Sequence, residues 1–233
     1  MNLKGLSTSI LLSSCIGYSA TAANLDIRIQ NLTHGITYTP LIVAAHGGSY
    51  HFFQSGTAAS PSLRAMAEGG DISGLNADAS AAGAVVVQNP NSGLLSPGRT
   101  TPQFSMDTGS NMYLSVAAML LPTNDGFAGV DAWKIPTVAG NYIINVNAYD
   151  AGTEVNNELL VSGGGVPGVL GMPASPVPGG TNGTGLADPN PNTNVHIHPG
   201  VLGDFDTTGG VSDIDARVHR WLNPVLRVFV TVK

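Results

Sequence analysis

The chain has 233 residues, of which only 10% are charged, with 30 glycines, 15 prolines and a formal net charge of −6 at pH 7. Proteins that bind nucleic acids through phosphate contacts need clustered lysine and arginine, and no run of basic residues occurs in this sequence, so we expect no nucleic-acid partner. A hydrophobic content of 42% is enough for one sizeable core, and all-β domains of this length commonly form a single unit.

Residues 1–23 are predicted to be an export signal peptide. Lys4 supplies the positive charge, residues 6–16 form a moderately apolar stretch, and Ala20-Thr21-Ala22 offers the small-residue pattern of a cleavage site. The apolar stretch is too short to span a bilayer comfortably, so we expect no transmembrane segment here. The sequence therefore predicts a protein that is exported to the periplasm, to the cell surface or into the medium.

The only cysteine, Cys15, lies inside this signal and leaves an alternative open. The segment Leu12-Ser13-Ser14-Cys15 resembles a bacterial lipobox, in which the cysteine becomes a lipidated first residue that anchors the protein to a membrane. With either cleavage the processed chain contains no internal disulfide. Its stability must then come from its core, from bound ions or from partners.

Hydrophobic residues alternate with polar ones at several places along the chain, which is typical of half-buried strands. This alternation occurs at residues 25–29, 144–148 and 226–232. Continuous apolar runs, which are typical of strands with both faces covered, occur at residues 41–45, 84–87 and 113–121. We therefore expect an all-β fold, a β-sandwich over residues 24–233 whose last strand returns to complete a sheet.

One short helix is expected among these strands, at residues 60–68. Ser60 is a suitable N-cap, Pro61 favours the first helical position, and Gly69-Gly70 follows the segment. Residues 163–194 are rich in glycine, proline and asparagine and show almost no periodicity. They are predicted to be an irregular surface insertion, a long Gly/Pro-rich loop, rather than a linker between two domains.

Two acidic, glycine-containing segments follow strand-like runs and are the candidate functional site. The first, residues 121–129, contains Asp125, and the second, residues 148–154, contains Asp150 and Glu154. Carboxylates in such turns are often only solvated or bonded to the backbone. If the loops converge, however, their charges repel unless a cation neutralises them, and ligands that are all oxygen favour Ca²⁺.

The chain resembles the spondin domain, the N-terminal module of the F-spondin and mindin extracellular-matrix proteins, and its bacterial stand-alone form in particular. The resemblance rests on Pro122-Thr123-Asn124-Asp125-Gly126-Phe127 and Tyr149-Asp150-Ala151-Gly152-Thr153-Glu154, with further support from residues 59–68 and 223–225. It implies an antiparallel β-sandwich similar to C2 domains, with Ca²⁺ held by loops at one end. The ligands that it implies are Asp125, Asp150 and Glu154, although the animal domains have Asp where this chain has Glu154.

A second acidic loop offers a competing calcium site. Residues 204–215 place Asp204, Asp206 and Asp215 at loop positions 1, 3 and 12, with glycine at position 6, which partly matches an EF-hand loop. Position 12 is not the usual glutamate, and the preceding segment cannot form an entering helix because Pro199-Gly200 interrupts it. The alternatives are a bound ion or a polar turn.

The histidines His196 and His198 are two positions apart and would face the same side of a strand. Such a pair could hold Zn²⁺ or Cu²⁺ with help from His46 or His51. No acidic or cysteine ligand lies at a recognisable zinc spacing, so an exposed strand face or a stacking contact is the other interpretation.

The sequence therefore predicts an exported, non-catalytic, calcium-binding adhesion or recognition module of the cell surface or extracellular matrix, with an unknown extracellular protein or glycan as its partner. No nucleophile elbow and no zinc-protease helix motif occurs. One alternative is a carbohydrate-active hydrolase that uses Asp125 and Asp150 as its carboxylate pair. Another is a metal-free scaffold whose long Gly/Pro-rich loop contacts the partner.

Overall fold

The structure is a computed structural model that describes residues 22–165, 169, 171–173, 192–206 and 210–233. The predicted signal peptide up to residue 21, including Cys15, and most of the predicted insertion at residues 163–194 lie outside the described residues. The strands are β1 (Asn24–Asn31), β2 (Thr37–Tyr38), β3 (Ile42–His46), β4 (Val85–Gln88), β5 (Phe104–Asp107), β6 (Tyr113–Leu121), β7 (Gly126–Lys134), β8 (Gly140–Asp150), β9 (Leu160–Val161), β10 (Met172–Pro173), β11 (His196–Ile197) and β12 (Leu226–Val232). The helices are α1 (Pro61–Gly69), α2 (Ser73–Ala81) and α3 (Ala216–His219).

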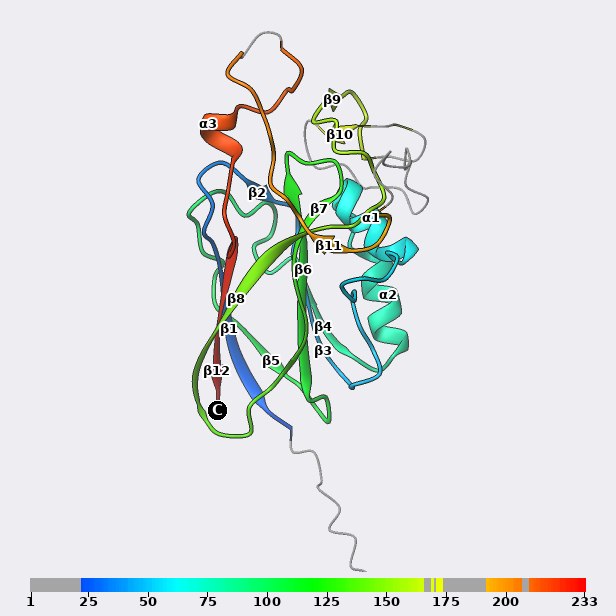
Figure 1. Ribbon diagram of the computed structural model, residues 1–233. Coiled ribbons are helices and arrows are strands. Elements are labelled where there is room, and N and C mark those ends of the chain that lie inside the picture. The colour runs from blue at the N-terminus through cyan, green and yellow to red at the C-terminus, as the bar shows by residue number, and fades with distance from the viewer. Residues whose placement is uncertain (1–21, 166–168, 170, 174–191, 207–209) are drawn as a thin grey trace, which may run out of the picture.

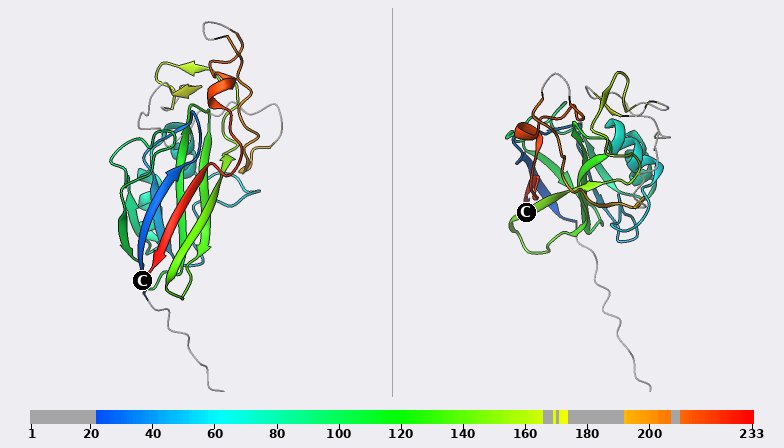
Figure 2. Two further views of the ribbon diagram at one scale, coloured as in Figure 1. Left: turned by 90° about the vertical axis from the view of Figure 1, so that its left-hand side faces the viewer. Right: turned by 45° about the horizontal axis from the view of Figure 1, so that its top comes forward.

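One ten-stranded antiparallel sheet dominates the molecule. Its strands follow the order β4-β3-β6-β7-β8-β12-β1-β5, while β11 pairs with β8 and β2 pairs with β6. The sheet curls so far that it is nearly closed, and the right-hand view of Figure 2 shows it wrapped around an interior with the helices α1 and α2 outside. The expected all-β antiparallel fold is therefore confirmed.

The alternating segments form the strands that enclose the interior core. Along β1 the apolar side chains of Leu25, Ile27 and Ile29 are fully buried, and the residues between them are not. The terminal strand β12 lies between β8 and β1, with Val230 opposite Ile27. These three strands run side by side in the left-hand view of Figure 2. The last strand thus returns to complete the sheet, as expected.

A second core lies on the outer face of the sheet, beneath the helices (Figure 1). The strand β6 contributes to both cores, because Val116 belongs to the core inside the curled sheet whereas Ala117 and Met119 belong to the outer core, together with residues of α1 and α2. Its continuous apolar sequence is explained by this double burial. The run at residues 84–87 differs: β4 pairs only with β3 and is partly exposed. The expectation that both its faces are covered holds only in part: Val86 packs against the outer core and Val87 against the inner core, but both are only partly buried.

The expected helix is present as α1. The Ser60 hydroxyl oxygen accepts a hydrogen bond from the Leu63 backbone N–H at 3.1 Å, and Pro61 is the first helical residue. Two further helices, α2 and α3, were not expected. In α2 only Leu75 and Ala79 are buried. Two buried positions are too few to give the repeating apolar pattern by which a helix is predicted from a sequence.

Replacing Ser60 tests the contribution of this cap. Ser60→Ala removes the acceptor for the Leu63 N–H, and we expect the free energy of unfolding to fall by about 1 kcal/mol, measured by urea denaturation. Ser60→Asp keeps an acceptor and should retain most of the stability. Ser80→Ala, at an exposed position of α2, is the matched control. An unchanged urea midpoint for Ser60→Ala would show that the cap is not stabilising.

Candidate functional site

The two predicted acidic segments meet at one end of the sheet, near β11 in Figure 1. Asp125 ends the turn between β6 and β7, and Asp150 is the last residue of β8. The strands β7 and β8 are paired so that Gly126 lies opposite Asp150. The Ala151 N–H also donates to the backbone oxygen of Asp125 at 3.2 Å. The sheet register therefore brings the segments together.

Asp125 binds the second segment through one carboxylate oxygen. Its Oδ2 accepts hydrogen bonds from the backbone N–H of Thr153 at 2.7 Å, the N–H of Glu154 at 3.0 Å and the Thr153 hydroxyl at 3.2 Å. The residue is 0% exposed, and its other oxygen, Oδ1, has no hydrogen-bond partner among the described residues. One oxygen is thus saturated while the other is buried and unpartnered.

Local backbone contacts hold both segments in place. In the first, the Thr123 hydroxyl donates to the Leu120 backbone oxygen at 2.6 Å and accepts from the Gly126 N–H at 3.0 Å. In the second, Gly152 has a φ of 70°, and a Cβ there would lie 2.6 Å from the backbone carbon of Thr193. Only glycine avoids both the strained conformation and the clash.

The other two predicted residues are also buried. Asp150 is 2% exposed, and its oxygens accept from the Gly152 N–H at 2.7 Å and from the Asn156 amide at 2.6 Å. Glu154 is 4% exposed, and the Asn124 amide lies 3.5 Å from its Oε2. The amides of Asn124 and Asn156 were not expected at the site, because asparagine in a polar loop has no sequence signal that distinguishes it from a solvated one.

The charges of these carboxylates oppose one another. Burial raises the pKa of Asp125 well above its ordinary value, and the nearby charges of Asp150 and Glu154 raise it further. The backbone hydrogen bonds from Thr153 and Glu154 lower the pKa but do not offset these effects. Without a cation, Asp125 therefore binds a proton more tightly in the folded protein than in the unfolded chain.

The donor chemistry of this end of the sheet fits a hard cation. The carboxylates and amides around Asp125 offer oxygen ligands, which Ca²⁺ prefers, and Asp125 Oδ1 is without a partner in the described chain. Among the described residues, however, no three His, Cys, Asp or Glu side chains are arranged as a group that could hold a metal ion, so Asp125, Asp150 and Glu154 do not form one. A cation here would also need amide, main-chain carbonyl or water oxygens, which Ca²⁺ commonly takes.

The neighbouring histidines pack rather than form a histidine cluster for a metal. His198 is 4% exposed, and its ring packs against that of Trp221 with centroids 5.1 Å apart and an interplanar angle of 60°, a tilted contact rather than the stacked one that was one of the expectations. Its Nδ1 accepts from the Gly200 N–H at 3.0 Å, and burial lowers its pKa, so the ring is neutral with its proton on Nε2. His196 is half-buried on β11, where its Nδ1 contacts the Asn194 backbone oxygen at 2.8 Å.

His46 and His51 do not join that pair. His46 Nε2 lies 2.7 Å from the Ser115 hydroxyl oxygen, within the sheet. His51 Nδ1 contacts the carboxylate of Asp131. The two residues belong to a separate polar network on β3, β6, β7 and the segment after β3.

The second acidic loop uses its carboxylates within the chain. Asp204 accepts backbone hydrogen bonds from Asp206, Val211 and Ser212, and Asp215 caps α3. The guanidinium of Arg217, 2.7 Å from Asp215, lowers the pKa of that carboxyl to about 2. These contacts agree with the polar-turn interpretation, and residues 207–209 lie outside the described part.

A buried carboxylate that sequence reasoning missed, Glu158, organises this region. It is 6% exposed and accepts hydrogen bonds from the Leu202 N–H at 2.6 Å, the Gly203 N–H at 2.7 Å and the Ser212 hydroxyl at 2.6 Å. Its own N–H donates to the side-chain oxygen of Asn124 at 3.1 Å. Glu158 therefore links the loop of Asp125 to residues 202–212.

Comparison with known families identifies the chain. The sequence model of the family Spondin_N matches residues 30–158, a span that includes both acidic segments and more than half of the chain. A search of curated proteins found no match. Among the described residues no helix has both the length and the apolar character needed to cross a membrane. The chain therefore belongs to the spondin N-terminal domain family, a family of non-catalytic extracellular modules of the adhesion and recognition type.

Proposed function

We propose that residues 24–233 are an exported, non-catalytic recognition module whose loops at one end of the sheet are ordered by Ca²⁺, with residues 1–23 as its export signal. The residues proposed to hold the ion are Asp125, Asp150 and Glu154. Family membership supports the recognition role. The observation that carries the calcium proposal is the buried Oδ1 of Asp125, which has no hydrogen-bond partner within the described part of the chain.

That oxygen poses an electrostatic problem for the protein by itself. A buried carboxylate with one unpartnered oxygen beside other carboxylates is costly, because desolvation and repulsion both act on it. The problem is relieved either by a proton or by a cation. At neutral pH and the calcium concentrations of extracellular environments, a cation is the more effective of the two, because protons are scarce there.

The residues of this site have different roles in the proposal. Asp125 uses Oδ2 to hold the backbone of Thr153 and Glu154, which leaves Oδ1 as a ligand. Asp150 and Glu154 add charge, and the amides of Asn124 and Asn156 are neutral groups that can change partners when an ion enters. Bound Ca²⁺ would supply the positive charge that lets these loops stay together and present a fixed surface to a partner.

The hydrolase alternative is weakened by burial. A glycosidase acid must reach the scissile bond of its substrate, whereas Asp125 is 0% and Asp150 2% exposed. The scaffold alternative places the partner contact on the Gly/Pro-rich segment, most of which lies outside the described residues. Metal analysis of protein purified without chelator separates that alternative from the calcium proposal.

Calcium titration of thermal stability tests the site. An ion that binds only the folded protein stabilises it by about 2.7 kcal/mol at a concentration about 100-fold above its Kd. For a domain of this size we expect the Tm to rise by roughly 5–10 °C relative to protein in EDTA. Asp150→Asn should abolish most of this rise, because it removes one charge from the site.

The matched control is Asp78→Asn, on the exposed face of α2, which should keep the full calcium response. A calcium-dependent rise in Tm that survives in Asp150→Asn would place the ion elsewhere. The absence of any rise in the wild-type protein would contradict the calcium proposal itself.

The pH dependence in EDTA tests the electrostatic argument. Because the folded-state pKa of Asp125 lies above its ordinary value of 3.8, the folded protein binds a proton more tightly than the unfolded chain does. The contribution of Asp125 to stability therefore falls as pH rises between these two pKa values. Asp125→Asn carries no such proton, so its Tm should rise relative to wild type as pH goes from about 5 to about 8.

The neutral His198 acts in the opposite direction, since its lowered pKa makes the fold less stable as pH falls. It is present in both proteins, so the Tm difference between them isolates Asp125. A Tm difference that does not change with pH would show that Asp125 is not strained by its charge. Asp78→Asn again provides the exposed control.

A further inference from the structure

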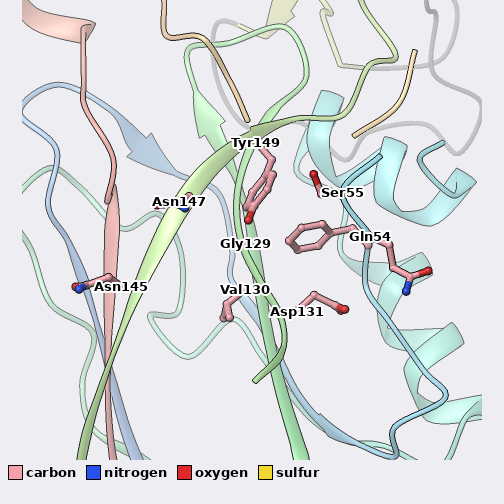
Figure 3. A pocket seen from close by; sticks show the side chains of 9 residues that line it. Gln54, Ser55, Gly129, Val130, Asp131, Asn145, Asn147 and Tyr149 are labelled. Atoms are coloured by element: carbon pink, nitrogen blue, oxygen red, sulfur yellow. The ribbon is translucent and has the colours of Figure 1, made fainter. Parts of the chain in front are cut away.

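A polar pocket lies on the outer face of the sheet, beside the edge of the second core. Its volume is about 260 Å³. Figure 3 shows Asn147 and Tyr149 of β8 on one side, Gln54 and Ser55 on the other, and Gly129 and Asp131 of β7 between them. Nothing in the calcium proposal uses these side chains.

The pocket lies where the apolar side chains that pack on the outer face of the sheet end. Phe53 packs on Phe127 and Tyr149, with ring centroids 5.0 Å and 4.8 Å apart, and is the last buried side chain of this cover. Gly129 makes this packing possible, since a Cβ at its position would lie 2.6 Å from Phe53 Cε1. Beyond Phe53 the outward-facing residues of β8 include the asparagines Asn145 and Asn147.

The walls of the pocket are held rigidly. Asp131 accepts hydrogen bonds from the Phe52 N–H at 2.7 Å and the Ser115 hydroxyl at 3.2 Å, and it also contacts His51. These contacts fasten the segment that carries Gln54 to the sheet. A pocket whose walls are already fixed loses little conformational entropy when a ligand enters.

The side chains that line the pocket favour a neutral ligand with several hydroxyl groups. No lysine or arginine belongs to the pocket lining that the structure describes, and Asp131 repels anions. Gln54 and Asn147 offer amides, Ser55 offers a hydroxyl, and each can donate as well as accept. The phenol of Tyr149 offers a further hydroxyl that can donate as well as accept.

An aromatic ring completes the lining. The Tyr149 ring stacks on Phe127 with an interplanar angle of 24° and is half-buried at the pocket. Sugars combine hydroxyl groups with an apolar C–H surface that packs on such rings. A small ammonium ion is less suited, because Asp131 already accepts hydrogen bonds from Phe52 and Ser115 and contacts His51.

We propose that this pocket binds a single neutral sugar residue, so that the ligand of the module is a neutral glycan. The volume of about 260 Å³ lies just below the roughly 300–1,000 Å³ typical of drug-sized ligands and suits one sugar ring. The inference rests on the proposed recognition role, to which it adds a ligand class. Gly129 and Tyr149 belong to the acidic segments, but the proposed calcium ligands Asp125, Asp150 and Glu154 do not line the pocket, so the proposal does not require calcium binding.

Ligand-observed NMR on the full exported chain tests this proposal. The probes are the methyl glycosides of glucose, galactose, mannose and N-acetylglucosamine, each titrated to about 20 mM, with tetramethylammonium and inorganic phosphate as charged probes. We expect at least one glycoside to bind with a Kd in the millimolar range. Phosphate should not bind, and tetramethylammonium should bind more weakly than that glycoside.

Two variants with matched controls locate the binding. Gln54→Ala removes an exposed amide and should weaken glycoside binding by at least about fivefold, whereas Gln103→Ala, an exposed glutamine elsewhere, should not. Asn147→Ala should have the same effect as Gln54→Ala. Its control is Asn141→Ala, on the same face of β8 but away from the pocket.

The outcome separates this proposal from the calcium proposal when all titrations are done in EDTA and again with calcium. Glycoside binding in EDTA that the two variants weaken supports the sugar pocket even if calcium leaves the Tm unchanged. No binding by any glycoside, binding that both variants leave unchanged, or stronger binding of tetramethylammonium would each overturn it, whatever the calcium response.

Discussion

The contact between the Asp125 carboxylate and the backbone of Thr153 and Glu154 is the interaction on which this end of the molecule depends. It joins the turn after β6 to the loop after β8 through one oxygen and leaves the other buried without a partner in the described chain. Because N–H donors stabilise a carboxylate while burial and like charges oppose it, the same residue both organises the loops and strains them. That combination is typical of functional sites rather than of structural turns.

The strands could be predicted because their burial follows their sequence. Alternation marked β1, β8 and β12, and the unbroken apolar run of β6 reflected two cores. The helix α2 and the edge position of β4 could not be seen, because tertiary contacts rather than periodicity determine them. The acidic segments could be found in the sequence, but their meeting depends on the pairing of β7 with β8, which composition does not reveal. The family resemblance indicated that the two segments form one site.

Other parts of both candidate sites had no sequence signal. Glu158, which links two loops through three acceptor contacts, is one glutamate in an irregular segment. Asn145 and Asn147 sit at outward positions of a half-buried strand, where polar residues are expected in any case. These asparagines line a pocket only because Phe53 packs over Gly129 beside them, and that contact depends on the tertiary structure.

The central place of β12 has a consequence for how the polypeptide acquires its shape. Leu25 pairs with Val232, so two adjacent strands of the sheet come from opposite ends of the chain. Such distant pairing slows folding, and a nascent polypeptide that lacks its last residues leaves β1 and β8 with open edges. The sheet is therefore completed only when the segment that forms β12 has paired, and until then the edges of β1 and β8 that β12 covers can pair with other chains.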